Sequence, residues 1–289
     1  MRERFKSVNL RAASVALVDT CNEIIEEYQE QGLRLTLRQL YYQLVSRNVI
    51  PNVERSYKNL SSLLNDARIG GYVDWDAIED RVRRPRAASE WNSIADLVDT
   101  AVRSFRLPRW EGQEAYAELW VEKDALAGVL EPLSREYHVT LMVNRGYSSA
   151  SAMYESSKRF IENSERDCRL FYLGDFDPSG EDMVRDVGAR LEMFGANVTV
   201  EKIALTMNQI RQYNPPPNPA KRTDPRAAEF IAKNGTTSYE VDALPPNILS
   251  GIVRQAFAKI IDVELMNEII AKEEIGKKKL VNAAKKIEV

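Results

Sequence analysis

Between residues 115 and 203 the sequence alternates short apolar runs with longer runs of helical spacing. The apolar runs predict strands at 115–121, 138–143, 169–174 and 197–203, and the intervening runs predict helices to about residue 134, at 149–162 and at 178–194. Such alternation favours a mostly parallel sheet flanked by helices. The second part of the chain is therefore expected to be an α/β domain.

The first part of the chain shows helical spacing instead. Helices are expected at 8–30, 36–48, 54–69 and 91–107, and a short β-prone segment at 72–75. Thr36 and Gln39 match a capping box, which marks a helix start. Helices followed by a small extended element outline an N-terminal helical winged-helix domain. Pro108 and Gly112 indicate a linker, so the expected domains are 1–110 and 111–289.

Local charge favours nucleic-acid binding by the first domain, although the whole chain has a net charge of -3. Between Arg34 and Arg68 there are six basic and two acidic residues. Further arginines follow at Arg81, Arg83, Arg84 and Arg86. A local basic surface of this kind is typical of DNA contact. The alternative is that these side chains form ordinary solvated helix faces.

The few sulfur and imidazole groups exclude several kinds of site. Cys21 and Cys168 are the only cysteines and His138 is the only histidine, which rules out a disulfide framework and a structural zinc site built from four cysteines or from two cysteines and two histidines. Catalysis must therefore use mainly carboxylates, tyrosine, lysine, arginine or a bound metal. The sequence has no P-loop, no apolar run of about 18 residues and no signal peptide, so a cytoplasmic location and no membrane association are expected.

Carboxylates follow two of the expected strands. Glu122 comes directly after the first strand, and Asp175 and Asp177 follow the third. Ligands of open parallel sheets bind at the carboxyl ends of strands, and three oxygen ligands there suit magnesium. Each acid taken alone fits an N-cap or a surface charge equally well. Lys123 and Asp124 next to Glu122 either assist this site or cap the following helix.

Several segments together resemble a known protein family. They are Val-Glu-Lys-Asp-Ala at 121–125, Gly-Tyr-Ser at 146–148, and Gly-Asp-Phe-Asp-Pro-Ser-Gly at 174–180. These resemble a Toprim domain, in the version found in the topoisomerase VI A subunit and the meiotic double-strand-break transesterase. Thr-Leu-Arg-Gln-Leu-Tyr-Tyr at 36–42 resembles the catalytic-tyrosine helix of that family, and Tyr-Glu-Val-Asp-Ala-Leu-Pro at 239–245 resembles its late strand-turn motif.

The resemblance implies roles for particular residues. Glu122, Asp175 and Asp177 would hold Mg²⁺, and Tyr42 would be the nucleophile with Arg38 beside it. It also implies a homodimer, in which the tyrosine of one protomer works with the carboxylates of its partner, and a separate ATPase subunit as a further partner. On physical grounds, Arg38 and Tyr42 are neighbours on one helix face, and a guanidinium favours the phenolate and can clamp a phosphate.

Alternatives remain open at this helix. Tyr41 and Tyr42 cannot face the same side, so one of them is expected to pack in the core, and Arg38 could be a plain phosphate contact. The first hypothesis is cleavage of double-stranded DNA by magnesium-dependent tyrosine transesterification, giving a 5′-phosphotyrosyl DNA intermediate. The alternatives are a Toprim metal-dependent nuclease that uses water, and a non-catalytic winged-helix DNA-binding protein.

Overall fold

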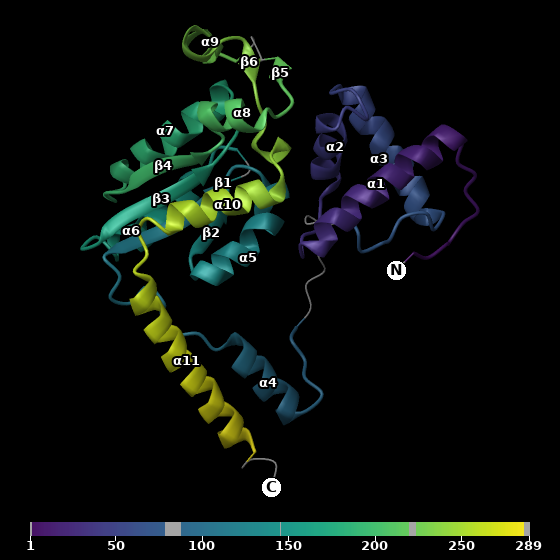
Figure 1. Ribbon diagram of the computed structural model, residues 1–289. Helices are drawn as coiled ribbons and strands as arrows, with labels where there is room; N and C mark the ends of the chain where they lie inside the picture. Colours follow the sequence, from purple (N-terminus) through teal and green to yellow (C-terminus); the bar gives the residue numbers. More distant parts are fainter. Residues whose placement is uncertain (1, 79–87, 145, 220–223, 286–289) are drawn as a thin grey trace.

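A computed structural model of the chain describes residues 2–78, 88–144, 146–219 and 224–285. Figure 1 shows a helical group at one side of the molecule, an α/β body at the other, and two helices that extend away from both. The arginines expected at 81, 83, 84 and 86 lie outside the described residues.

The α/β body is built on one parallel sheet, as expected. Its strands are β1 (Ala115–Val121), β2 (Thr140–Val143), β3 (Asp167–Leu173) and β4 (Thr199–Ala204). The spatial order is β2-β1-β3-β4, and every neighbouring pair is parallel. Val121 of β1 lies opposite Leu173 of β3. The residues that follow these two strands therefore meet at one edge of the sheet.

Helices cover both faces of this sheet. They are α5 (Ala127–Tyr137), α6 (Ala150–Ile161), α7 (Pro178–Met193) and α10 (Pro246–Phe257). Side chains of a strand alternate between faces, so Leu119 packs in the hydrophobic core with α5 and α10. Trp120 packs in a separate core with α6 and α7. Full burial of such residues stabilises the domain by roughly 1.5–3 kcal/mol per large apolar side chain.

The helical group consists of three helices that share their own apolar core. They are α1 (Ala12–Glu30), α2 (Leu37–Ser46) and α3 (Glu54–Ile69). The predicted capping box is present, because the Thr36 side chain accepts from the Gln39 backbone N–H while the Gln39 side chain accepts from the Thr36 N–H. The helices of the expected DNA-binding domain therefore form, with α3 at the expected bounds.

The expected extended element at 72–75 does not form a strand. In the described part of this group, extended pairing is limited to one isolated bridge between Leu35 and Ile78. The side chains explain this difference. The Tyr72 hydroxyl donates to the Val8 carbonyl, and Arg68 stacks on Trp75 at 4.6 Å from its ring centroid. Both aromatic residues are fixed against other parts of the group, so the structure leaves the winged-helix assignment unconfirmed.

The remaining elements are short, apart from the last helix. They are α4 (Ile94–Ser104), α8 (Met207–Tyr213), α9 (Ala227–Asn234), α11 (Val263–Ala284), the antiparallel pair β5 (Asn218–Pro219) and β6 (Thr237–Ser238), and the 3₁₀ turns η1 (Asp124–Leu126) and η2 (Val241–Ala243). The C-terminal region thus consists of two helices, α10 and α11, with a break between them.

Helix α4 packs against α11, as Figure 1 shows, although it was expected in the first domain. A Cβ atom on Gly276 would lie only 2.6 Å from the Phe105 ring, so glycine permits this close approach. The buried Glu273 carboxylate accepts from Arg109 at 3.0 Å and from the Leu107 N–H at 3.1 Å. The domain boundary near residue 110 stays a prediction, and α4 contacts the C-terminal helix.

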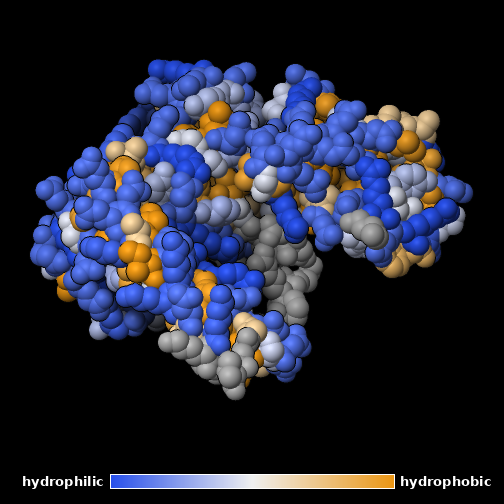
Figure 2. Space-filling view, turned by 60° about the horizontal axis from the view of Figure 1, so that its bottom comes forward, coloured by the Kyte–Doolittle hydropathy of each residue, from blue (hydrophilic) through white to orange (hydrophobic). Residues whose placement is uncertain are grey.

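The surface in Figure 2 is largely hydrophilic, with hydrophobic residues in separate patches. Among the helices described in the structure, none is long and apolar enough to cross a membrane.

Candidate metal centre and tyrosine site

The carboxyl edge of the sheet opens into a cavity of about 270 Å³ that contains the three predicted acids. Its lining is predominantly polar and consists of Arg38, Glu122, Lys123, Asp175, Asp177, Ser179, Asn218, Ser238, Tyr239 and Glu240. The strand register accounts for this convergence, because Glu122 and Asp175 follow adjacent parallel strands. Arg38 comes from α2, so the cavity lies where the helical group meets the α/β body.

Each predicted acid has a specific partner in this cavity. Glu122 Oε2 accepts from the Asp175 backbone N–H at 3.0 Å. Asp175 Oδ1 accepts from the Val241 N–H at 2.9 Å. Asp177 is the N-cap of α7, and its Oδ1 accepts from the Gly180 N–H at 2.6 Å. A Cβ on Gly180 would lie 2.3 Å from the Asp175 carbonyl oxygen, so this tight turn requires glycine.

The tightest acidic cluster differs from the predicted set. Among the described residues, the acids whose oxygens all lie within 4.8 Å of one another are Asp175, Glu240 and Asp242, called here the acidic triad. Glu122 and Asp177 line the same cavity but are engaged by backbone N–H groups instead. The structure thus brings all three predicted residues to one cavity, yet only Asp175 joins the triad.

A long-range backbone contact brings Glu240 and Asp242 to the sheet edge. Phe176 and Tyr239 exchange two backbone hydrogen bonds of 2.8 and 2.9 Å, so the segment after β6 runs beside the segment after β3. Sequence reasoning noted residues 239–245 only as a family motif and missed their acids as ligands. The alternation Glu240-x-Asp242 repeats that of Asp175-x-Asp177 and was the available signal.

Two basic side chains neutralise part of the triad. Lys123 Nζ lies 2.8 Å from Asp175 Oδ2 and 3.0 Å from Asp242 Oδ1, and it also bonds Glu240. Arg38 Nε donates to Asp242 Oδ2 at 2.7 Å, and its Nη2 bonds Glu240. Arg38 therefore links α2 directly to the acidic triad.

Two neighbouring acids of this cavity, Asp175 and Glu240, have widely separated pKa values. Burial raises the pKa of Asp175 to about 7; Lys123 acts in the opposite direction, and the charges of Glu122, Asp242 and Glu240 add to the increase. Burial also raises the pKa of Glu122. For Glu240, burial acts in the same direction, but Lys123 and Arg38 outweigh it and lower the pKa to about 2. Separated pKa values of neighbouring carboxyl groups are typical of functional sites.

The donor set fits a divalent metal ion. Asp175, Glu240 and Asp242 each offer a carboxylate oxygen, and these oxygens all lie within 4.8 Å of one another. The Ser238 hydroxyl, in a cavity-lining residue that is 7% exposed, has no hydrogen-bond partner in the described part of the chain. Carboxylate and hydroxyl oxygens are the ligands that Mg²⁺ and Ca²⁺ prefer. The triad could therefore hold a metal ion whose identity is not fixed by these residues.

The structure separates the roles of the two adjacent tyrosines. The Tyr41 hydroxyl donates to Asn52 Oδ1 at 3.1 Å, away from the acids. The Tyr42 hydroxyl accepts from Arg38 Nη2 at 3.5 Å, and Tyr42 is buried. Burial and then the charges of Asp242 and Glu240 raise the pKa of Tyr42, and Arg38 only partly offsets them. Arg38 lowers the pKa of Tyr42, as expected. The net shift is nevertheless upward, so the neutral phenol is favoured over the phenolate.

Several residues of the expected basic surface are engaged within the chain. Arg38 bonds the triad, Arg47 pairs with Glu27, and Lys58 pairs with Glu54 at 2.7 Å. Arg34 and Arg55 are exposed. The positive charge available for DNA on the described helices is therefore smaller than the sequence count indicates.

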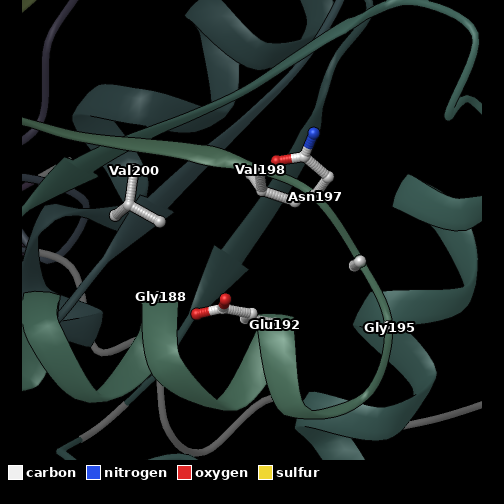
Figure 3. A pocket seen from close by; sticks show the side chains of 7 residues that line it. Gly188, Glu192, Gly195, Asn197, Val198 and Val200 are labelled. Carbon is white, nitrogen blue, oxygen red and sulfur yellow. The ribbon is translucent and has the colours of Figure 1, made fainter.

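A larger hollow of about 510 Å³ lies at the opposite end of β4 (Figure 3). It is lined by Gly188, Glu192, Gly195, Ala196, Asn197, Val198 and Val200. Of these described lining residues, only Glu192 is ionisable. This lining offers few groups that could bind a metal ion or take part in a reaction. The smaller cavity beside the acidic triad is therefore the candidate functional site.

No model of a known protein family matches this sequence, and no curated protein matches it at a significant level.

Proposed function

We propose that this protein cleaves duplex DNA by metal-dependent transesterification through Tyr42. The observation that carries the proposal is the position of Arg38, which contacts both the Tyr42 hydroxyl and the acids Glu240 and Asp242. A candidate nucleophile and a candidate metal site therefore share one arginine. The resemblance of the tyrosine helix and of the Toprim motifs supports the same reaction.

In the proposed reaction, the Tyr42 hydroxyl oxygen attacks a DNA phosphorus. The new bond joins this oxygen to phosphorus, the bond from phosphorus to the 3′ oxygen breaks, and the 3′ oxygen leaves with a proton. A metal ion at the acidic triad would stabilise negative charge on the phosphate and on the leaving oxygen. The product is a 5′-phosphotyrosyl bond, which retains the phosphoester and so permits religation.

The properties of Tyr42 and Arg38 suit this proposed reaction. The raised pKa of Tyr42 keeps its hydroxyl protonated until substrate arrives, so the proton must leave during attack. The Arg38 guanidinium, already beside the hydroxyl, would turn toward the incoming phosphate as a bidentate donor. The proposal also includes a homodimer and a separate ATPase subunit as partners, both on the basis of the resemblance.

One observation favours a second candidate, a metal-dependent nuclease that activates water. Tyr42 is only 5% exposed, whereas the acidic triad borders an open cavity. A hydrolase would use the triad and leave Tyr42 as a packing residue. Its products would carry free ends rather than attached protein.

A denaturing gel with DNA labelled at its 3′ end separates the two candidates. Wild type with Mg²⁺ or Mn²⁺ should retain label on the protein, and Tyr42→Phe should reduce this by at least about 1,000-fold, because the nucleophile is lost. Tyr41→Phe is the matched control and should retain the linkage. Cleavage to free ends that persists in Tyr42→Phe would favour the hydrolase and contradict transesterification.

A further inference from the structure

Lys123 occupies the place of a cation at the centre of the acidic triad. Its ammonium group bonds all three acids, at 2.8 Å to Asp175, at 3.0 Å to Asp242, and to Glu240. An ammonium has three N–H donors, so each donor serves one carboxylate. Lys123 is the second residue after β1, so the ordered strand fixes the backbone position from which its side chain extends.

The triad depends on this positive charge. The Asp242 side chain is fully buried, those of Asp175 and Lys123 are 9% and 17% exposed, and that of Glu240 is 24% exposed. Carboxylates this close repel one another, and buried charges persist only when they are paired. Arg38 serves Glu240 and Asp242 only. Lys123 is therefore the cation that holds Asp175 to the other two acids.

We propose that Lys123 is the internal counter-ion of the metal-free site and that a divalent cation binds there by displacing its ammonium group. The same carboxylate oxygens cannot be contacted closely by both cations. Oxygens within 4.8 Å of one another suit a single ion with bonds of about 2.1–2.5 Å.

A second observation points to a ligand at this place. Ser238, which is 7% exposed and lines the cavity, has a buried hydroxyl without a partner among the described residues. The lysine bonds the triad without reaching this oxygen. A hydrated metal ion in the cavity would supply the missing partner.

Displacement also gives the lysine a second position. Lys123 lines the cavity, so its ammonium on a flexible stem can turn into that space, where an anionic phosphate of the proposed substrate would lie. Metal loading would thereby expose a positive charge for substrate. This inference deepens the proposed function and rests on its metal-binding part.

Titration of the DNA-free protein with Mn²⁺ by calorimetry tests the displacement. Lys123→Met should bind Mn²⁺ roughly tenfold or more tightly than wild type, because the metal no longer competes with an internal cation. Lys202→Met is the matched control, since Lys202 bonds the Asp175 carbonyl oxygen and Glu181 instead of the triad carboxylates. It should change the affinity less than threefold. Equal or weaker binding by Lys123→Met would overturn the proposal.

Melting temperatures provide a second readout. Without metal, Lys123→Met should melt below wild type, and saturating Mn²⁺ should raise its melting temperature by more than that of wild type. Should the methionine variant fail to fold, Lys123→Gln keeps a neutral amide donor group without the positive charge, and the same tighter binding is expected. Tighter Mn²⁺ binding without covalent DNA capture would overturn the proposed transesterification and leave the displacement standing.

Discussion

At the scale of single residues, the Asp175 carboxyl group lies in a strongly perturbing environment. Burial and the neighbouring acids raise its pKa from 3.8 to about 7. The folded protein therefore holds a proton there between about pH 4 and 7, where the unfolded chain has released it. Stability must fall as pH rises through this window, by at most about 1.4 kcal/mol per pH unit for one proton.

We expect Asp175→Asn to reduce this pH dependence in the metal-free protein and to leave the part that comes from Glu122, whose pKa burial also raises. Two other groups change stability differently. The contribution of Glu240 to folding stability is lost only as pH falls toward 2. Burial lowers the pKa of His138, so this residue makes stability increase as pH rises. Comparing wild type with Asp175→Asn therefore isolates the Asp175 proton. Denaturant unfolding at pH 5 and pH 8 in a chelator measures it, and equal pH slopes in the two proteins would contradict the assignment.

The sequence could place some site residues but not others. Glu122, Asp175 and Asp177 were predictable because local strand patterns put them at strand ends, and adjacent parallel strands end together. Glu240 and Asp242 reach the triad through the pairing of Tyr239 with Phe176, a contact between distant segments that no local pattern encodes. The burial that raises the pKa of Tyr42 is likewise a property of the packed structure.

At the scale of elements, α2 and η2 meet at the junction of the helical group and the α/β body. Arg38 supplies two ion pairs there, and Asp242 is fully buried. Ala243 of η2 packs in the core of the helical group. Helix α2 is thereby fastened to the acidic triad by both charge and packing.

Replacement of Arg38 by Met should loosen this attachment. Amide hydrogen exchange in residues 39–45 should become faster by about tenfold or more, because truncating a partner of a buried charge removes at least about 1.4 kcal/mol. Arg47→Met, at the C-cap of the same helix, is the matched control, since its pair with Glu27 is exposed and contributes about 0–1 kcal/mol. Unchanged exchange in Arg38→Met would show that packing alone holds α2.

The positions of helices and strands were predicted well where the spacing of apolar residues was regular. The predicted bounds of β1 and α3 agree with the structure. The element expected at 72–75 failed because side-chain contacts of Tyr72 and Trp75, rather than β propensity, decide the backbone there. The position of α4 on α11 depends on the close approach at Gly276, which sequence spacing does not reveal.

At the scale of the whole molecule, the helical group and the α/β body contribute to one cavity. From the helical group, Arg38 lines the cavity and contacts the Tyr42 hydroxyl; from the α/β body, Asp175 and Glu240 of the acidic triad line it. Neither part holds both a nucleophile candidate and a metal site. The proposed chemistry therefore depends on the two parts acting together, within one chain or across a dimer.

The most direct test of this proposal identifies the residue that carries DNA. Wild-type protein is incubated with duplex DNA and Mg²⁺, digested with nuclease and protease, and its peptides are sequenced by mass spectrometry. The account predicts a nucleotide joined through its 5′ phosphate to Tyr42, present only when a divalent cation is added. DNA cleavage with Tyr42 unmodified, or a nucleotide on any other residue, would contradict it.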